Sequence, residues 1–240
     1  MLRRHIVTYL LCLFSGSFLS ANAQSPLEIE GAFGFGLGES QPYSNMLISA
    51  RIHYNTTMSS TFGLGLWESG YNKQWLTEAS DAKTIFHLYD GKTLPIIQSG
   101  IKIQHPIGKI GLYPISIGVE PFVTFLPFSA RTAHLEETYF SKDDAASTLA
   151  GKDIFERTGS ADFAIKSACH PRVYVGGAVH FSTIVKESIR VQLGFGYTTL
   201  DLFKDLRTEN LHGVPLNEHL PKSGIKYISL AFSYHNRTNQ

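Results

Sequence analysis

Hydrophobic and polar residues alternate strictly, with a period of two, between residues 189 and 200. One face of an extended strand would carry the apolar residues Ile189, Val191, Leu193, Phe195 and Tyr197. The alternate positions are polar or glycine. A tilted strand needs about 9–11 residues to cross a bilayer, and this stretch is long enough. The pattern therefore predicts a β-strand with one apolar and one polar face.

The same alternation recurs about eight times along the chain. The predicted strands cover residues 27–38, 46–55, 61–68, 95–105, 115–125, 172–183, 189–200 and 226–234. The fifth strand is the least regular because Pro114 and Pro121 interrupt it. Proline donates no hydrogen bond to a strand ladder, so we expect a bulge near one of the two. Repeated amphipathic strands predict an all-β fold.

Short and long connections alternate between these strands. Short turns follow the second, fourth and sixth strands, and the turn at 105–108 is indicated by its proline and glycine. Long connections span 69–94, 127–171 and 201–223. Membrane barrels place short turns on the periplasmic side and long loops outside. The chain is therefore predicted to be a transmembrane, antiparallel, up-and-down β-barrel with long extracellular loops and short periplasmic turns.

Two of the long connections are expected to contain elements of their own. Within 69–94, the Asp90-Gly91 pair predicts a hairpin with a two-residue turn, formed by strands that project beyond the membrane. Within 127–171, residues 141–144 resemble a helix N-terminus, and Gly151 and Gly159 would end short helical pieces. A folded lid or plug is suggested by the aromatic residues Phe128, Tyr139, Phe140, Phe155 and Phe163.

Charged residues in the predicted strands share a face with the glycines. A charge that faces lipid at the bilayer midplane costs about 2–4 kcal/mol, so these residues are expected to face the lumen. The expected lumen network comprises Glu28, Glu30, Arg51, Lys102, Glu120 and Arg190. Side chains can fill the lumen of an eight-stranded barrel. A structural network of ion pairs is therefore the first interpretation, and a gate or narrow conduit is the alternative.

The overall composition argues against an ordinary soluble domain and a nucleic-acid-binding protein. Charged residues make up 17% of the chain, below the roughly 25% of an ordinary soluble domain. The 21 basic and 20 acidic residues nearly cancel, so nothing indicates a nucleic-acid partner. No stretch approaches 18 consecutive apolar residues, so no transmembrane helix is expected.

The N-terminus has the pattern of a secretory signal. Arg3 and Arg4 precede a short apolar run, and an Ala-x-Ala cleavage site ends at Ala23. Residues 1–23 are therefore predicted to be a signal peptide that is removed, which leaves 24–240 as the barrel domain. The mature chain would keep a single cysteine, which excludes an internal disulfide.

With its strand number, alternation and loop asymmetry, the chain resembles the eight-stranded outer-membrane barrels of the OmpA-transmembrane-domain, OmpX and OmpW type. This resemblance implies a Gram-negative outer membrane, contact with its lipid and lipopolysaccharide, and insertion by the barrel assembly machinery. Many proteobacterial members end on an aromatic residue, usually phenylalanine. Here the polar tail 235–240 follows Phe232 and Tyr234, which is more similar to small barrels of the Bacteroidota.

Few residues suggest catalysis or a cofactor. His180-Phe181-Ser182 resembles the His-x-Ser of lipid A deacylase barrels, but Thr183 follows where that family has asparagine, and chance is the better explanation. The histidines are scattered without the spacing of metal ligands, so no metal site and no cofactor are expected.

Four functions are compatible with a barrel. The first is a non-enzymatic outer-membrane protein with a filled polar lumen, whose surface loops bind an unknown extracellular partner or shield the cell. The second is a porin-like transporter of small solutes or hydrophobic compounds, and the third is a lipid-modifying enzyme. The fourth, a secreted lipocalin-like barrel, requires an apolar lumen and a charged exterior, the reverse of the pattern in this sequence.

Overall fold

The structure is a computed structural model. It describes residues 27–37, 43–128, 132–166, 170–185, 189–201, 203–204, 206–208, 210–211, 214–220 and 223–234. The predicted signal peptide with its cleavage site, the cysteine at position 169 and the C-terminal tail lie outside these residues. Among the described residues, no helix has the length and apolar character needed to cross a membrane.

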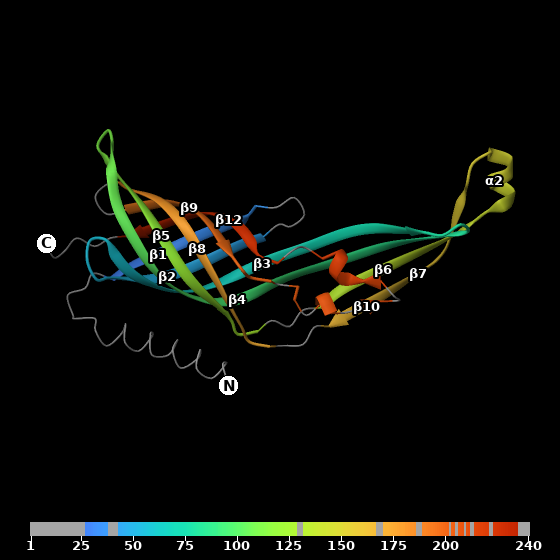
Figure 1. Cartoon of the computed structure of the whole chain (residues 1–240), viewed down its shortest axis with the longest axis horizontal. Helices are drawn as coiled ribbons and strands as arrows, with labels where there is room; N and C mark the ends of the chain where they lie inside the picture. The colour runs from blue at the N-terminus through green and yellow to red at the C-terminus, as the bar shows by residue number, and fades with distance from the viewer. Residues whose placement is uncertain are drawn as a thin grey trace.

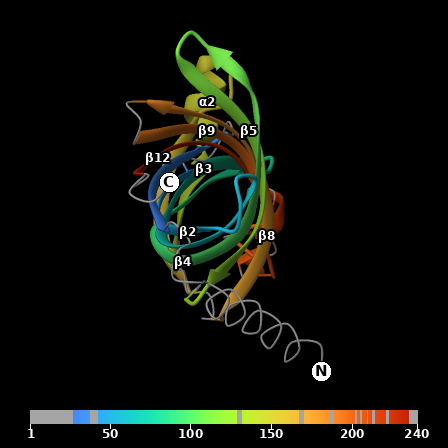
Figure 2. The ribbon, with the colours of Figure 1, turned by 90° about the vertical axis from the view of Figure 1, so that its left-hand side faces the viewer.

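Eight antiparallel strands close into a ring (Figures 1 and 2). They are β1 (Leu27–Gly36), β2 (Tyr43–His53), β3 (Met58–Glu78), β4 (Ala82–Ile110), β5 (Tyr113–Leu126), β8 (Arg172–Val185), β9 (Ile189–Thr198) and β12 (Ile225–Tyr234). The ring closes because β1 pairs with β2 on one side and with β12 on the other. Closure leaves no free sheet edge within the barrel. The prediction of an eight-stranded antiparallel barrel is confirmed.

The two ends of the barrel differ. The end that carries the short connections 54–57 and 111–112 is called the turn end, and the opposite end is called the loop end. The pairing of Ile29 with Tyr234 places the start of β1 and the end of β12 at the turn end. The long connections leave from the loop end, so the predicted alternation of short and long connections is confirmed.

At the loop end, β3 and β4 continue as a long ribbon far beyond the other barrel strands (Figure 1). Strand β6 (Thr132–Lys142) pairs with β4 there, and β7 (Phe155–Lys166) pairs with β6. We call residues 69–92 of β3 and β4, together with β6 and β7, the extension sheet. Helix α2 (Asp144–Ala150) lies at its far tip (Figure 1).

The prediction for the connection 69–94 is partly right. Strands do project beyond the barrel, but the predicted turn at Asp90-Gly91 is wrong. Gly91 pairs with Gly70 in the middle of the ribbon, and the chain reverses at 79–81 instead. Asp90 and Gly91 favour a turn locally, but the continuous pairing of β3 with β4 keeps them in an extended strand.

The predicted helix start is confirmed in the connection 127–171. The Asp143 side chain accepts a hydrogen bond from the Ala146 amide at 2.9 Å, and Gly151 ends α2 with φ 65°. Gly159 does not end a helix, because it lies within β7. The expected lid or plug is also wrong for β6 and β7, which extend the sheet beside β4 rather than covering the barrel.

The predicted turn at 105–108 is wrong as well. Strand β4 continues to Ile110, with a bulge between Pro106 and Gly108, and the chain turns at 111–112. The bulge lies opposite Ile115, next to Pro114, so the expected bulge near a proline is present. The extra residue belongs to β4 and not to the proline-bearing strand β5. Short remaining strands β10 (Asn210–Leu211) and β11 (Val214–Pro215) form a separate pair in the last loop.

Candidate functional site: the filled lumen and its cap

The barrel is apolar outside and polar inside. Outward-facing side chains are well exposed, such as Phe35 at 62% and Leu64 at 58%. Inward-facing charged side chains are buried, such as Glu28 and Arg51, both at 0%. This arrangement is the reverse of a soluble β-barrel and matches the alternation of a barrel that sits in lipid.

The residues expected in the lumen form a charged layer near the turn end. All six are buried: Glu28, Glu30, Arg51, Lys102, Glu120 and Arg190. They come from β1, β2, β4, β5 and β9, so the layer joins most of the ring. Three acidic and three basic groups balance one another, which is what burial of ionised groups requires.

Glu28 is the centre of the charged layer. Its carboxylate accepts hydrogen bonds from Nη1 of Arg190 at 2.9 and 3.1 Å. His53 Nε2 lies 2.8 Å from Oε2 of Glu28. Arg51 Nη1 lies 3.5 Å from Oε1 of Glu28, and Nη2 of the same side chain donates to Glu30. Because the two arginines come from opposite sides of β1, these contacts tie β2, β1 and β9 together across the lumen.

A second chain of contacts crosses the same layer. The Lys102 ammonium donates to Oε1 of Gln192, and Nε2 of Gln192 lies 2.9 Å from Nδ1 of His180. An ammonium can only donate, so the amide nitrogen of Gln192 must face the imidazole, and Nδ1 of His180 accepts. His180 Nε2 then lies 3.0 Å from Glu120, whose other oxygen accepts from Thr61 at 2.7 Å.

His180 and Ser182, the pair that resembles a deacylase motif, serve different contacts. His180 contacts Gln192 and Glu120, whereas the Ser182 hydroxyl accepts a hydrogen bond from Gln104 at 3.1 Å. A base must reach the hydroxyl of a serine to activate it. Both side chains therefore belong to the packing of the lumen.

A small cavity of about 40 Å³ remains above the charged layer. Its lining includes Glu30, Glu120, His180, Phe122 and Tyr227. A cavity of this size holds at most a few water molecules. The lumen is therefore filled by side chains at this level.

Aromatic side chains close the lumen towards the loop end. Trp67 is 4% exposed and makes edge contacts with Tyr43 and Tyr227, at centroid distances of 6.4 and 6.2 Å. Phe122 is also buried in the same cluster. We call these four residues the aromatic layer. The lumen thus changes from charged to apolar along the barrel axis.

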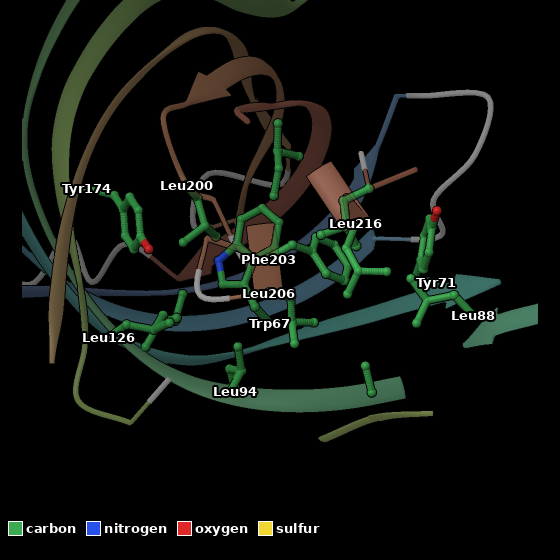
Figure 3. Close-up of a cluster of buried hydrophobic side chains, with 14 of the residues drawn as sticks. Trp67, Tyr71, Leu88, Leu94, Leu126, Tyr174, Leu200, Phe203, Leu206 and Leu216 are labelled. Atoms are coloured by element: carbon green, nitrogen blue, oxygen red, sulfur yellow. The ribbon is translucent and has the colours of Figure 1, made fainter. Parts of the chain in front are cut away.

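The last long connection packs over the aromatic layer and forms an apolar cap with the base of the extension sheet (Figure 3). The buried residues of the cap are Tyr71, Phe86, Leu88, Leu94, Leu126, Leu135, Tyr174, Leu200, Phe203, Leu206, Leu216 and Leu220. They come from the five strands β3, β4, β5, β6 and β8 and from the connection between β9 and β12. This cap resembles the core of a soluble domain.

Specific contacts hold this connection on the sheet. The Tyr71 hydroxyl donates to the His219 carbonyl, and the Tyr71 ring lies 5.5 Å from that of Phe203. Trp75 stacks between Phe86 at 5.2 Å and His219 at 4.0 Å. Burial lowers the pKa of His219 below its ordinary value and raises the pKa of Tyr71.

The cap was not predicted from the sequence. Trp67, Tyr71 and Trp75 all point into the lumen or the cap. Tyr197 and Tyr234 do face outwards, at 47% and 62% exposure. The signal that could have revealed the cap is a change of face in β3: apolar residues are outward up to Leu66 and inward from Trp67.

No family model matches the chain, and no curated protein matches it. Solved structures with a similar arrangement include the N-terminal β-barrel domain of Pseudomonas aeruginosa OprF, with 8% identity and a TM-score of 0.34 over 89% of this chain and 98% of that one. Neisserial surface protein A has 13% identity and a TM-score of 0.34, over 88% and 94% of the two chains. Ail of Yersinia pestis has 11% identity and a TM-score of 0.33, over 88% and 97%. The class of fold, an eight-stranded up-and-down β-barrel, rests on the closed strand ladder itself.

Proposed function

We propose that this protein is a non-enzymatic barrel of the Gram-negative outer membrane, closed to solutes, that carries the extension sheet at the cell surface for binding or shielding. The single observation behind the proposal is the inverted barrel, with an apolar exterior and a buried, charge-balanced interior. In a barrel that spans a bilayer, the apolar exterior faces lipid and every strand finds a partner. The short turns would then face the periplasm and the extension would face outwards.

Two successive barriers support a closed lumen. The charged layer binds side chains from opposite walls, and the aromatic layer and cap cover it on the loop side. A solute would have to break buried ion pairs and also displace an apolar core. The alternative of a porin-like transporter needs a continuous path, and the cavity between the charged layer and the aromatic layer has a volume of about 40 Å³.

Solute flux through proteoliposomes that hold the mature protein tests the closed lumen. Folding is first verified by the heat-dependent mobility shift of barrels on an SDS gel. We expect flux no greater than that of empty vesicles, for the native protein and for Thr138→Ala, a control on the extension sheet far from the lumen. Flux through the folded native protein that changes in Lys102→Ala or Glu120→Ala would favour the transporter instead.

The membrane location is tested separately by fractionation. The protein should remain with outer membranes after alkaline washing, because a spanning barrel resists extraction that removes peripheral proteins. Release into the wash would contradict the whole proposal, whatever the flux result.

A further inference from the structure

A depression in the outward face of the barrel wall lies near the loop end. Its volume is about 640 Å³, and the outward positions of its lining are Val119, Pro121, Gly177, Val179, Phe195 and Tyr197. The inward positions Glu120, Ala178, Gly196 and Tyr227 also contribute to its lining. The rim towards the loop end is formed by Leu37 and Lys226. We call this depression the wall notch.

The strand register explains why the wall is hollow here. Pro121 pairs with Gly177, Gly177 pairs with Tyr197, and Tyr197 pairs with Lys226, so these four outward positions form one row across β5, β8, β9 and β12. Gly177 contributes no side chain to this row. The gap between the proline ring and the tyrosine ring is therefore open towards the surroundings of the barrel.

The notch lies where three paired strands meet. Pro121, Gly177 and Tyr197 pair without a register shift across β5, β8 and β9, whereas the pairing of β5 with β4 is interrupted between Phe122 and Val119. Val119, Val179 and Phe195 form the next row towards the turn end and make the lower part of the notch apolar. A flexible hydrocarbon chain fits such a surface.

A positively charged side chain, that of Lys226, lies beside this apolar surface. Lys226 faces outwards and is exposed, and neighbouring strands in the row are about 4.8 Å apart, which puts its backbone about 10 Å from that of Gly177. Its side chain extends from the last outward position of β12 at the loop end, next to the ring of Tyr197. A lysine and a tyrosine at the edge of an apolar band are the residues that contact lipid headgroups.

From this combination we propose that the wall notch binds one molecule of a phosphorylated lipid of the outer leaflet, with lipid A chemistry. The lipid phosphate pairs with Lys226, and one acyl chain lies over Gly177 between Pro121 and Tyr197. The inference rests on the proposed function, because the notch meets lipid only if the barrel spans a membrane.

The test is native mass spectrometry of the mature protein released from detergent micelles and titrated with bisphosphorylated lipid A. We expect one adduct that saturates first, and weaker adducts with phosphatidylcholine of equal chain length. Lys226→Gln should weaken the first adduct about fivefold, since a lysine near a charged lipid surface contributes about that factor. Gly177→Leu should weaken it about tenfold by filling the notch.

Gly177 and Gly31 form a matched pair of variants. A β-carbon on Gly177 would be 3.8 Å from the Glu120 carbonyl, an ordinary contact, so the substitution is tolerated by the wall. Gly31 also faces outwards, on β1, and a β-carbon there meets nothing within 4 Å. Gly31→Leu should leave the first adduct unchanged, as should Lys109→Gln on the turn-end hairpin.

The outcomes separate the notch from the barrel. If Gly177→Leu and Gly31→Leu bind lipid A equally well, the proposed lipid site is wrong. Equal binding of phosphatidylcholine and lipid A would also overturn it. Neither result would contradict the membrane barrel. If Gly177→Leu does not fold, an unchanged adduct in folded Lys226→Gln overturns the site. A native protein that shows no heat-dependent mobility shift would instead overturn the proposed function.

Discussion

Strands β3 and β4 pass through two regions with opposite chemistry. In the barrel, Leu64 faces outwards at 58% exposure, whereas in the extension the inward Tyr71 is 3% exposed. The apolar face changes sides between Leu66 and Trp67 in β3 and between Ile96 and Ile97 in β4. Leu66 pairs with Pro95 and Ile96 with Gly65, so the two changes lie within two residues of each other along the ladder.

This narrow band of the ladder is where we expect the outer surface of the membrane. Below it, lipid solvates the apolar face and the charged layer fills the interior. Above it, water is outside, so apolar residues turn inwards and form the cap. In this continuous ribbon, the face that carries the apolar residues therefore changes where the solvent changes. The hydrogen bonding between β3 and β4 continues without a break.

The largest expected effect is a loss of barrel stability when the charged layer is disrupted. Arg51→Met removes the arginine that pairs with Glu30 and one of the two arginines beside Glu28, and removing one member of a buried ion pair typically costs about 3–5 kcal/mol. Unfolding by denaturant in phospholipid vesicles measures this loss. The control is Lys83→Met in the extension, whose exposed contact with Glu78 at 2.8 Å is worth about 0–1 kcal/mol. Similar losses in the two variants would contradict a buried charged layer.

The next prediction breaks the cap. Phe203 is 2% exposed, and replacing a buried phenylalanine with alanine costs about 3–5 kcal/mol. Because Phe203 lies in the connection between β9 and β12 and not in a barrel strand, Phe203→Ala should raise hydrogen exchange in the cap while the heat-dependent mobility shift persists. Phe128→Ala, at an exposed position of 62%, is the control and should leave exchange unchanged. Loss of the mobility shift would mean that cap and barrel fold as one unit.

A third pair of variants sharpens the comparison of outer faces. Leu64 and Leu76 lie on the same face of β3 and are exposed to 58% and 49%. Leu64→Arg should destabilise the barrel in vesicles by up to about 2–4 kcal/mol if it faces the lipid core. Leu76→Arg should change stability by about 0.5 kcal/mol or less, because it faces water. Equal costs would argue against a membrane boundary between the two positions.

The tip of the extension should respond less. Asp143 caps α2 through the Ala146 amide, and replacing such a cap with alanine costs about 1 kcal/mol. Asp143→Ala should raise hydrogen exchange in α2 alone. Asp143→Asn keeps an acceptor and should restore most of the protection. A change that spreads to the barrel would show that the tip is not an independent unit.

The smallest effect is a pH dependence of the cap. Burial lowers the pKa of His219, so neutral His219 is favoured in the folded cap. Its stabilising contribution is present above the ordinary histidine value of about 6.5 and is lost as the pH falls through the lowered pKa of the folded protein. Fluorescence of the stacked Trp75 should therefore change on acidification below about pH 6.5. His219→Asn should abolish that change, and a persisting change would assign it to another group.

Much of the barrel was predictable because its determinants are local. Each strand carries its own alternation, and the cost of placing a charge in lipid fixes which face is inside. This reasoning located the eight strands and assigned the charged residues to the interior. The partners of each charge were not predictable, because Arg190 and Glu28 meet only when β9 and β1 are brought together across β12.

The sequence by itself determined the alternation of faces, the order of short and long connections and the helix start at Asp143. Only the tertiary structure decided that β6 and β7 join β4, that the connection after β9 packs over the lumen, and that Gly177 opens a notch beside Tyr197. The physical reason is the range of the interactions. Alternation responds to the solvent on each side of one strand, whereas these features depend on contacts between residues far apart in the chain.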